Sequence, residues 1–259
     1  MNISTTFLAV YVLGTSAAAI VTLLRGLRTA TDQAGLTGRQ QRRSFWTGSG
    51  LLIGWFFAAL LPSWLGLFRG MSTRIPTIEF GLLLPILGGV IFYRRSALLR
   101  QITAAAPQSL LVGIQIYRVL GVIFLVLLAA GSLPRGFALP AGTGDVAVGL
   151  LAPAVAVAFA RGMRGSRGLV RAWNVLGLAD LLVAVTTGFL SSPSALQSFA
   201  FDKPNTLVTA FPLVMIPVFL VPLAVLLHLA SLSKLGWKKA APHDEGALLR
   251  ERRLSARLG

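Results

Sequence analysis

Three ionisable side chains lie inside otherwise apolar stretches of the sequence. Arg118, Asp145 and Asp180 each have long runs of hydrophobic residues on both sides. A charged side chain at the centre of a bilayer costs about 2.5–3.5 kcal/mol on insertion scales, so each one needs a partner or a function. A guanidinium beside two carboxylates can serve as a packing contact, a polar binding site, or a proton relay in which one carboxylate stays free to titrate.

Other polar residues share helical positions with these three. Gln115 precedes Arg118 by three residues and Tyr117 is its direct neighbour, so both belong to the same part of one predicted helix. Asn174 lies on the stripe next to Asp180 in a second predicted helix. Side chains three or four residues apart lie on one face of a helix. We therefore include Gln115, Tyr117 and Asn174 among the candidate substrate-binding or proton-relay residues.

Small residues accompany the two buried aspartates. Gly142 and Gly149 flank Asp145 at helical spacing, and Gly177 precedes Asp180 by three residues. Small residues allow membrane helices to approach closely. We therefore expect the fourth, fifth and sixth predicted spans to pack together, with Arg118 facing Asp145, Asp180 or both.

Two further ionisable residues are secondary candidates. Glu79 is predicted to lie one turn inside the outer boundary of its span, where an interfacial position would also explain it. His228 is predicted near the cytoplasmic end of the last span, where it could pass protons or bind a lipid headgroup. With no cysteine and only two histidines, the sequence predicts no metal site, and no residue is assigned a catalytic role.

The composition indicates what kind of protein positions these residues. Of 259 residues, 55% are hydrophobic and 12% are charged, and the mean hydropathy is +0.76. A soluble domain has about 25% charged residues, so a soluble globular domain is excluded. The abundance of Leu, Val, Ile and Phe excludes a disordered chain. A polytopic membrane protein remains.

Seven stretches are long and apolar enough to cross the hydrocarbon core, which needs about 20 residues. We predict an all-α bundle of about seven transmembrane helices in residues 1–232, followed by a basic tail in 233–259. This tail either contacts anionic inner-leaflet lipids or is a disordered segment whose charges only set the orientation. The predicted spans are 4–24, 44–68, 75–93, 109–130, 139–160, 169–190 and 207–230.

The basic residues indicate the orientation of this bundle. Nineteen of the 24 Lys and Arg residues fall in 25–43, 94–108, 161–171 and the tail, and only four fall in the connections on the other side. Positive loops stay cytoplasmic, so we expect an inner-membrane protein with its N-terminus outside and its C-terminus inside. This distribution also explains the net charge of +16, so we expect no nucleic-acid partner.

The seventh predicted span contains Pro212, Pro217 and Pro222. Each proline removes a backbone donor and disturbs the preceding turn, so we expect a bent helix whose polar groups are satisfied inside the bundle. Broken helices often line transport sites.

Two functional classes fit these features. The first is a small-molecule or proton-coupled transporter or binding protein with a polar site among spans four to seven. The alternative is a non-catalytic membrane sensor or assembly component, bound to a membrane-protein partner, whose buried charges are structural. An enzyme is less favoured because thiols, metal ligands and catalytic motifs are missing. No cofactor is predicted, and covalent retinal is not expected because Lys203 and Lys234 flank the last span without entering it.

Overall fold

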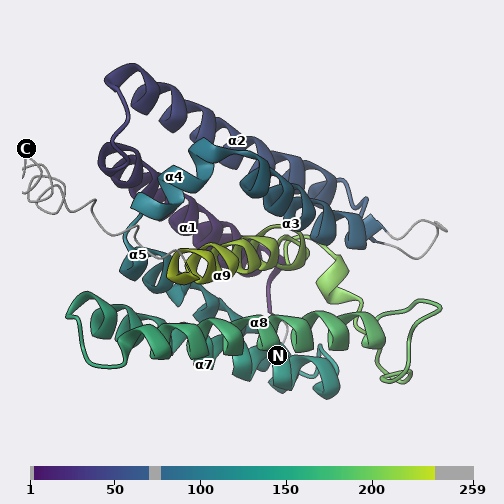
Figure 1. Ribbon diagram of the computed structural model, residues 1–259. Coiled ribbons are helices and arrows are strands. Elements are labelled where there is room, and N and C mark those ends of the chain that lie inside the picture. The colour runs from purple at the N-terminus through teal and green to yellow at the C-terminus, as the bar shows by residue number, and fades with distance from the viewer. Residues whose placement is uncertain (1–2, 70–76, 237–259) are drawn as a thin grey trace, which may run out of the picture.

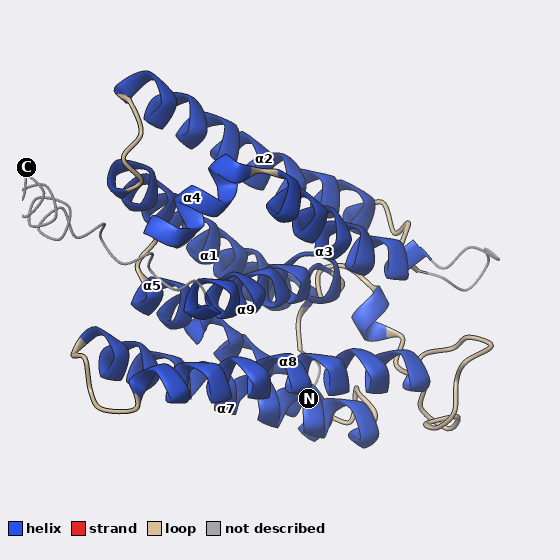
Figure 2. Cartoon of the chain, in the orientation of Figure 1, coloured by secondary structure: helices blue, strands red, loops and turns tan. Residues whose placement is uncertain are grey.

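The computed structural model describes residues 3–69 and 77–236, and within these ranges every regular element is helical (Figure 2). The first half contains α1 (Thr5–Gln33), α2 (Gly38–Trp64), α3 (Thr77–Arg95), α4 (Ala97–Ala105), α5 (Gln108–Gly113), η1 (Ile114–Gly121) and α6 (Val122–Ala129). The second half contains α7 (Arg135–Ala160), α8 (Ser166–Ser191), the short η2 (Leu207–Thr209), η3 (Ile216–Leu220) and α9 (Val221–Gly236).

The helices have the length and hydropathy of membrane spans. Six helical segments in the described residues are long and apolar enough to cross a membrane, and α5, η1 and α6 together make up one of them. The consecutive helices α3 and α4 would add a seventh span, although they are bent by 95° at the break between them. The prediction of an all-helical fold with six or seven long apolar helices is therefore confirmed for the described part of the chain, and these helices are compatible with a membrane bundle.

The helices run in roughly one direction across the view in Figure 1. The pair α1 and α2 lies on one side, α7 and α8 lie on the other, and α9 lies between them with contacts to both α3 and α8. The connections 33–38, 105–108 and 160–166 reach the same end of the bundle as the end of α9 (Figure 1). Basic residues gather in the helix ends beside these connections, such as Arg28 in α1 and Arg39 in α2, and in the connection 160–166 itself, which holds Arg161 and Arg164.

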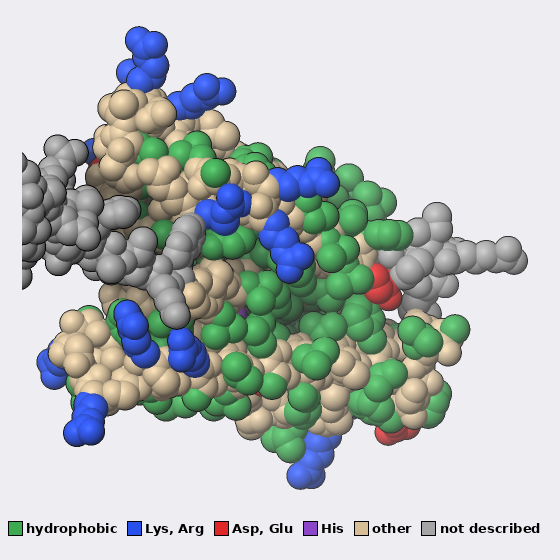
Figure 3. Space-filling model, in the orientation of Figure 1, with side chains coloured by type: hydrophobic (Ala, Val, Ile, Leu, Met, Phe, Trp, Pro, Cys, Tyr) green, Lys and Arg blue, Asp and Glu red, His purple; other side chains and the backbone are tan. Residues whose placement is uncertain are grey.

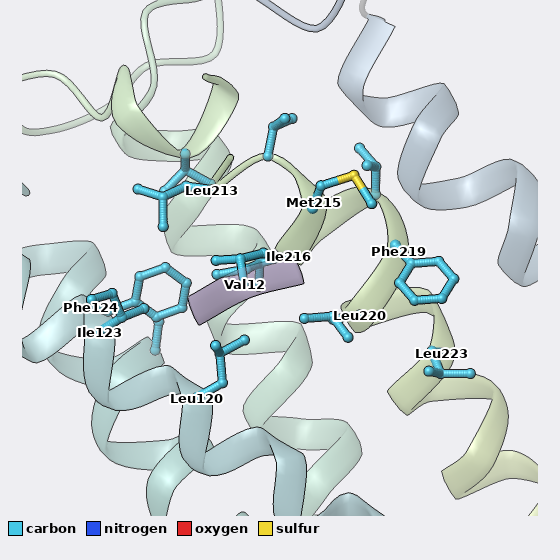
Figure 4. Close-up of a cluster of buried hydrophobic side chains, with 14 of the residues drawn as sticks. Val12, Leu120, Ile123, Phe124, Leu213, Met215, Ile216, Phe219, Leu220 and Leu223 are labelled. Atoms are coloured by element: carbon cyan, nitrogen blue, oxygen red, sulfur yellow. The ribbon is translucent and has the colours of Figure 1, made fainter. Parts of the chain in front are cut away.

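The hydrophobic core is built around η3 and the start of α9. Figure 4 shows Ile216 and Leu220 directed toward Leu120 and Phe124, which come from η1 and α6. Phe219 is directed to the opposite side, where its ring packs on those of Trp55 and Phe56 at 4.9 and 5.2 Å. A helix that is hydrophobic all round is stable only when neighbours surround it, which explains the central place of this segment.

One helix was not predicted. The sequence indicated a loop over 94–108, but α4 occupies most of it and is capped by the Ser96 hydroxyl, which accepts a hydrogen bond from the Leu99 N–H at 3.1 Å. Ile102 is buried with Ala30 and Ala34 of the α1 end. This packing also explains why α1 continues to Gln33 rather than ending near residue 24.

The prediction for the last span was wrong at both ends. The prolines predicted a bent helix over 207–230, and the structure divides this segment: the short η2 comes first, Pro212 lies in a turn, and uninterrupted helix begins at Ile216, as a π-helix. The helix then continues to Gly236, so residues 233–236 belong to α9 rather than to a tail. Lys234 consequently lies in the last turn of α9, where its ammonium donates to the Ala104 oxygen at 2.8 Å. The rest of the predicted tail, 237–259, lies outside the described residues.

Candidate functional site

Arg118 lies in the middle of a span that is not α-helical throughout. Between α5 and α6 the chain winds as a 3₁₀ helix for eight residues, Ile114–Gly121. Such runs rarely exceed three or four residues, and a 3₁₀ stretch inside a helix often marks a hinge or a strained segment. The Arg118 side chain extends from this segment into the bundle and is 3% exposed.

The guanidinium of Arg118 contacts both predicted aspartates. Its Nε donates to Oδ1 of Asp145 at 2.8 Å, and its Nη2 is 2.7 Å from the same oxygen. Nη2 also forms an ion pair with Oδ2 of Asp180. The structure therefore brings η1, α7 and α8 together around one cation, and Arg118 is shared between the two carboxylates.

The remaining guanidinium nitrogen faces α8 and α9. Nη1 donates to the Gly177 oxygen at 3.3 Å and is 3.2 Å from Nε2 of His228. A guanidinium has only donors, so Nε2 must be the acceptor and the imidazole proton belongs on Nδ1, which donates to Oδ1 of Asn174 at 2.9 Å. With both carboxylates ionised and this imidazole neutral, the cluster has one excess negative charge.

A line of buried polar side chains continues from His228. The Asn174 amide donates to the Ser231 hydroxyl at 2.8 Å, and the Gln108 amide donates to the same hydroxyl at 2.6 Å. All of these side chains are buried, and Gln108 is the first residue of α5. The polar line thus runs from the two carboxylates to the end of the bundle where α5 begins.

Glycines provide the space for the charged cluster. A methyl group at Gly144 would overlap the Asp180 carboxylate, and one at Gly177 would overlap the His228 ring. At Gly121 it would lie 2.9 Å from Oδ2 of Asp145. The sequence pointed to Gly177 as a site of close approach, whereas Gly121 and Gly144 were missed.

Gln115 and Tyr117 have a different place from the one expected. Gln115 donates to the Ala224 oxygen at 3.1 Å, and Tyr117 donates to the Leu220 oxygen at 2.9 Å. These two hydrogen bonds connect η1 to η3 and to the start of α9. Tyr117 also lines a narrow cleft together with Arg118 and Asp145.

A cavity of about 410 Å³ reaches the cluster. Asp145 and Glu79 both line it, and most of the other lining side chains are apolar. Figure 3 shows a hollow on this face, between the part formed by α3 and α4 and the part formed by α7 and α8, bordered mainly by hydrophobic side chains. The volume lies in the range of small-molecule pockets, about 300–1,000 Å³. Glu79, a secondary candidate predicted to lie one turn inside the outer boundary of its span, thus shares a cavity with Asp145.

His228 has a more central place than the sequence indicated. It was expected near the end of its span, but it is fully buried, contacts Arg118, and packs its ring 4.9 Å from that of Trp173. The shorter predicted span misplaced it, because α9 continues for eight residues beyond it. The i,i+3 spacing of His228 and Ser231 is the signal that could have indicated a polar face.

These features define a helical protein with helices of membrane-spanning length and a buried ionic cluster beside a cavity. A model of the family described as "Domain of unknown function (DUF8737)" matches residues 75–236, and the chain belongs to this family. The matched region contains every member of the cluster and of the polar line, as well as Glu79. No curated protein and no solved structure matches the chain.

Proposed function

We propose that this protein is a multi-pass inner-membrane transporter or binding protein for a small molecule, with its site in the cavity that reaches Asp145. The observation that carries this proposal is the continuity between the cavity and the Arg118 cluster. A cluster needed for packing alone has no reason to border a cavity of ligand size. Intramembrane ionisable residues that face such a space commonly belong to substrate or ion pathways.

The unequal number of charges supports coupling to protons. One guanidinium faces two carboxylates, so a single proton or a single ligand cation would neutralise the excess charge. Proton uptake and cation binding would then compete for the same carboxylates. The concentration of basic residues at one end supports an N-out, C-in orientation, in which the cavity belongs to the outer half of the membrane.

Two departures from α-helical geometry support a moving element. The 3₁₀ helix η1 holds Arg118, and the π-helix η3 lines the cavity through Ile216 and Pro217. Interrupted helices near the middle of the membrane are a recurring feature of transport sites. A change in the winding of either segment would move the cluster relative to the cavity.

Flux measurements in proteoliposomes test the proposal. Purified protein is reconstituted with a panel of labelled small molecules, and counterflow and uptake are measured with and without an imposed proton gradient. We expect at least one compound to show gradient-dependent flux that Asp180→Asn uncouples from pH. The matched control is Asp202→Asn, which removes an exposed carboxylate from a loop. Equal fluxes through wild type and Asp180→Asn for every compound would contradict the proposal.

A second candidate function is that of a non-catalytic assembly component. The observation in its favour is that Arg118 ties η1, α7, α8 and α9 together, as a purely structural cluster would. This protein would then bind another membrane protein through its outer faces. Purification from native membranes in mild detergent tests it, because a stoichiometric partner should remain bound to wild type and to Asp180→Asn alike.

A further inference from the structure

We infer that the cavity binds a lipophilic cation, a molecule with an apolar body and one positive charge, which enters sideways from the lipid between α3 and α8. This inference rests on the proposed small-molecule site and names its ligand class.

The hydrogen bonds of Arg118 exclude an anionic ligand. A guanidinium has five N–H groups. In the structure four hydrogen bonds run from them to Asp145, Asp180, the Gly177 oxygen and His228, and Nη2 is also 2.7 Å from Oδ1 of Asp145. An incoming carboxylate or phosphate would compete with the two aspartates for the guanidinium, and with both aspartates ionised it would meet one excess negative charge.

The carboxylates, by contrast, still have acceptor capacity. Arg118 uses Oδ1 of Asp145 and Oδ2 of Asp180, and the other oxygen of each group accepts no hydrogen bond from the described residues. Asp145 borders the cavity directly. Glu79 adds a second carboxylate to the wall, and its buried Oε2 has no partner within residues 3–69 and 77–236. The acceptors in the cavity wall thus favour a positively charged group.

The other walls suit an apolar or aromatic body. Phenylalanine rings line the cavity from four different segments: Phe68, Phe124, Phe137 and Phe189. Phe124 and Phe137 pack edge to face, with centroids 5.2 Å apart. Aromatic faces attract cations as well as apolar groups. These walls therefore provide both parts of a lipophilic cation with favourable contacts.

The position of the hollow indicates the route of entry. The helices run across the view in Figure 1, and Figure 3, in the same orientation, shows the hollow on the flank of the bundle. Both α3 and α8 pack on α9, so the space between them is bordered by two helices that would face lipid. The connection after α8 also lines the cavity, through residues such as Ser192, Leu196 and Thr206, so it borders the cavity at the end of the bundle. A molecule already dissolved in the bilayer can reach the flank between α3 and α8 directly.

Two ions of similar size and opposite charge test the inference. The full chain in phosphatidylcholine nanodiscs is dialysed against tetraphenylphosphonium or tetraphenylborate, and binding to empty nanodiscs is subtracted. We expect saturable binding of the phosphonium only, weakened about tenfold or more in Asp145→Asn, because one charge contact is lost. Thermal unfolding of each variant verifies that it remains folded.

A pair of substitutions in α8 tests whether the cavity is the binding site without changing any charged residue. Ala184 lines the cavity, whereas Leu182 is 68% exposed and does not line it. Ala184→Phe should abolish phosphonium binding by filling the cavity, and Leu182→Phe should leave it unchanged. If Ala184→Phe binds as wild type does, the cavity is not the site and the inference is overturned.

The remaining outcomes separate this inference from the proposed function. Saturable binding of tetraphenylborate that Ala184→Phe removes would overturn the cationic class while supporting a small-molecule site. Absence of saturable phosphonium binding to folded wild type would overturn the inference as well. The proposed function would then be tested independently by the flux measurements with the wider panel of compounds.

Discussion

Tyr117 donates a hydrogen bond to the backbone oxygen of Leu220 across 2.9 Å, and so joins the 3₁₀ helix η1 to the π-helix η3. The two segments depart from α-helical winding in opposite directions, one tighter and one wider. They meet directly beside Arg118, the residue after Tyr117. The hydroxyl of Tyr117 therefore helps to fix where the buried guanidinium lies.

Tyr117→Phe should destabilise the protein by about 1 kcal/mol, the net contribution of one hydrogen bond. Tyr11→Phe is the matched control, because its hydroxyl reaches the Leu120 oxygen at a weaker 3.4 Å. The free energy of unfolding in mixed micelles is the measurement. A larger loss of unfolding free energy in Tyr11→Phe than in Tyr117→Phe would mean that the hydrogen bond between η1 and η3 contributes little to stability.

Gly177→Ala adds a single methyl group, and we expect it to lower the free energy of unfolding by about 1–3 kcal/mol. The added methyl would overlap the His228 ring and lie 3.1 Å from Nη1 of Arg118, and neither group can retreat without losing a partner. Gly168→Ala is the control on the same helix, where nothing lies within 4 Å. That change should be neutral or slightly stabilising, since alanine favours helix. Equal melting temperatures for the two variants would argue against tight packing at the cluster.

His228 should be the tautomer with its proton on Nδ1. This follows because Arg118 can only donate to Nε2 and Asn174 Oδ1 can only accept from Nδ1. Solid-state NMR of ¹⁵N-histidine-labelled protein distinguishes the tautomers, and a His243→Gln sample assigns the His228 signal. A protonated Nε2 in wild type would mean that the guanidinium contact at 3.2 Å is not a hydrogen bond.

Much of this fold follows from the sequence, because long apolar runs and clustered arginines are strong signals. The pairing of Arg118 with the aspartates was also within reach, since each charge needs a partner at that depth. The polar line through Gln108 and Ser231 could not be predicted. Neutral polar side chains cost less free energy than charges inside a membrane helix, so their presence does not require a particular partner. The cavity was also inaccessible to sequence reasoning, since Glu79 reaches the space beside Asp145 only through the packing of α3 against η3 and α9.

Substitution of Arg118 should cost more stability than substitution of Asp180. Removing one member of a buried ion pair typically costs about 3–5 kcal/mol, because the partner charge is stranded. Arg118→Gln strands two carboxylates, whereas Asp180→Asn leaves the guanidinium matched one to one with Asp145. We therefore expect Arg118→Gln to unfold far more readily than wild type, and Asp180→Asn to be close to neutral or stabilising.

The double variant Arg118→Gln/Asp180→Asn completes this test, because it removes one of the two stranded charges. Its free energy of unfolding should recover part of the loss seen in Arg118→Gln, and the coupling between the two sites is obtained from the thermodynamic cycle. A large loss in Asp180→Asn alone would instead mean that both carboxylates are needed to hold the helices together. That result would favour the assembly role. A neutral Asp180→Asn would mean that the second carboxylate is retained despite its desolvation cost, as a binding or proton-carrying group would be.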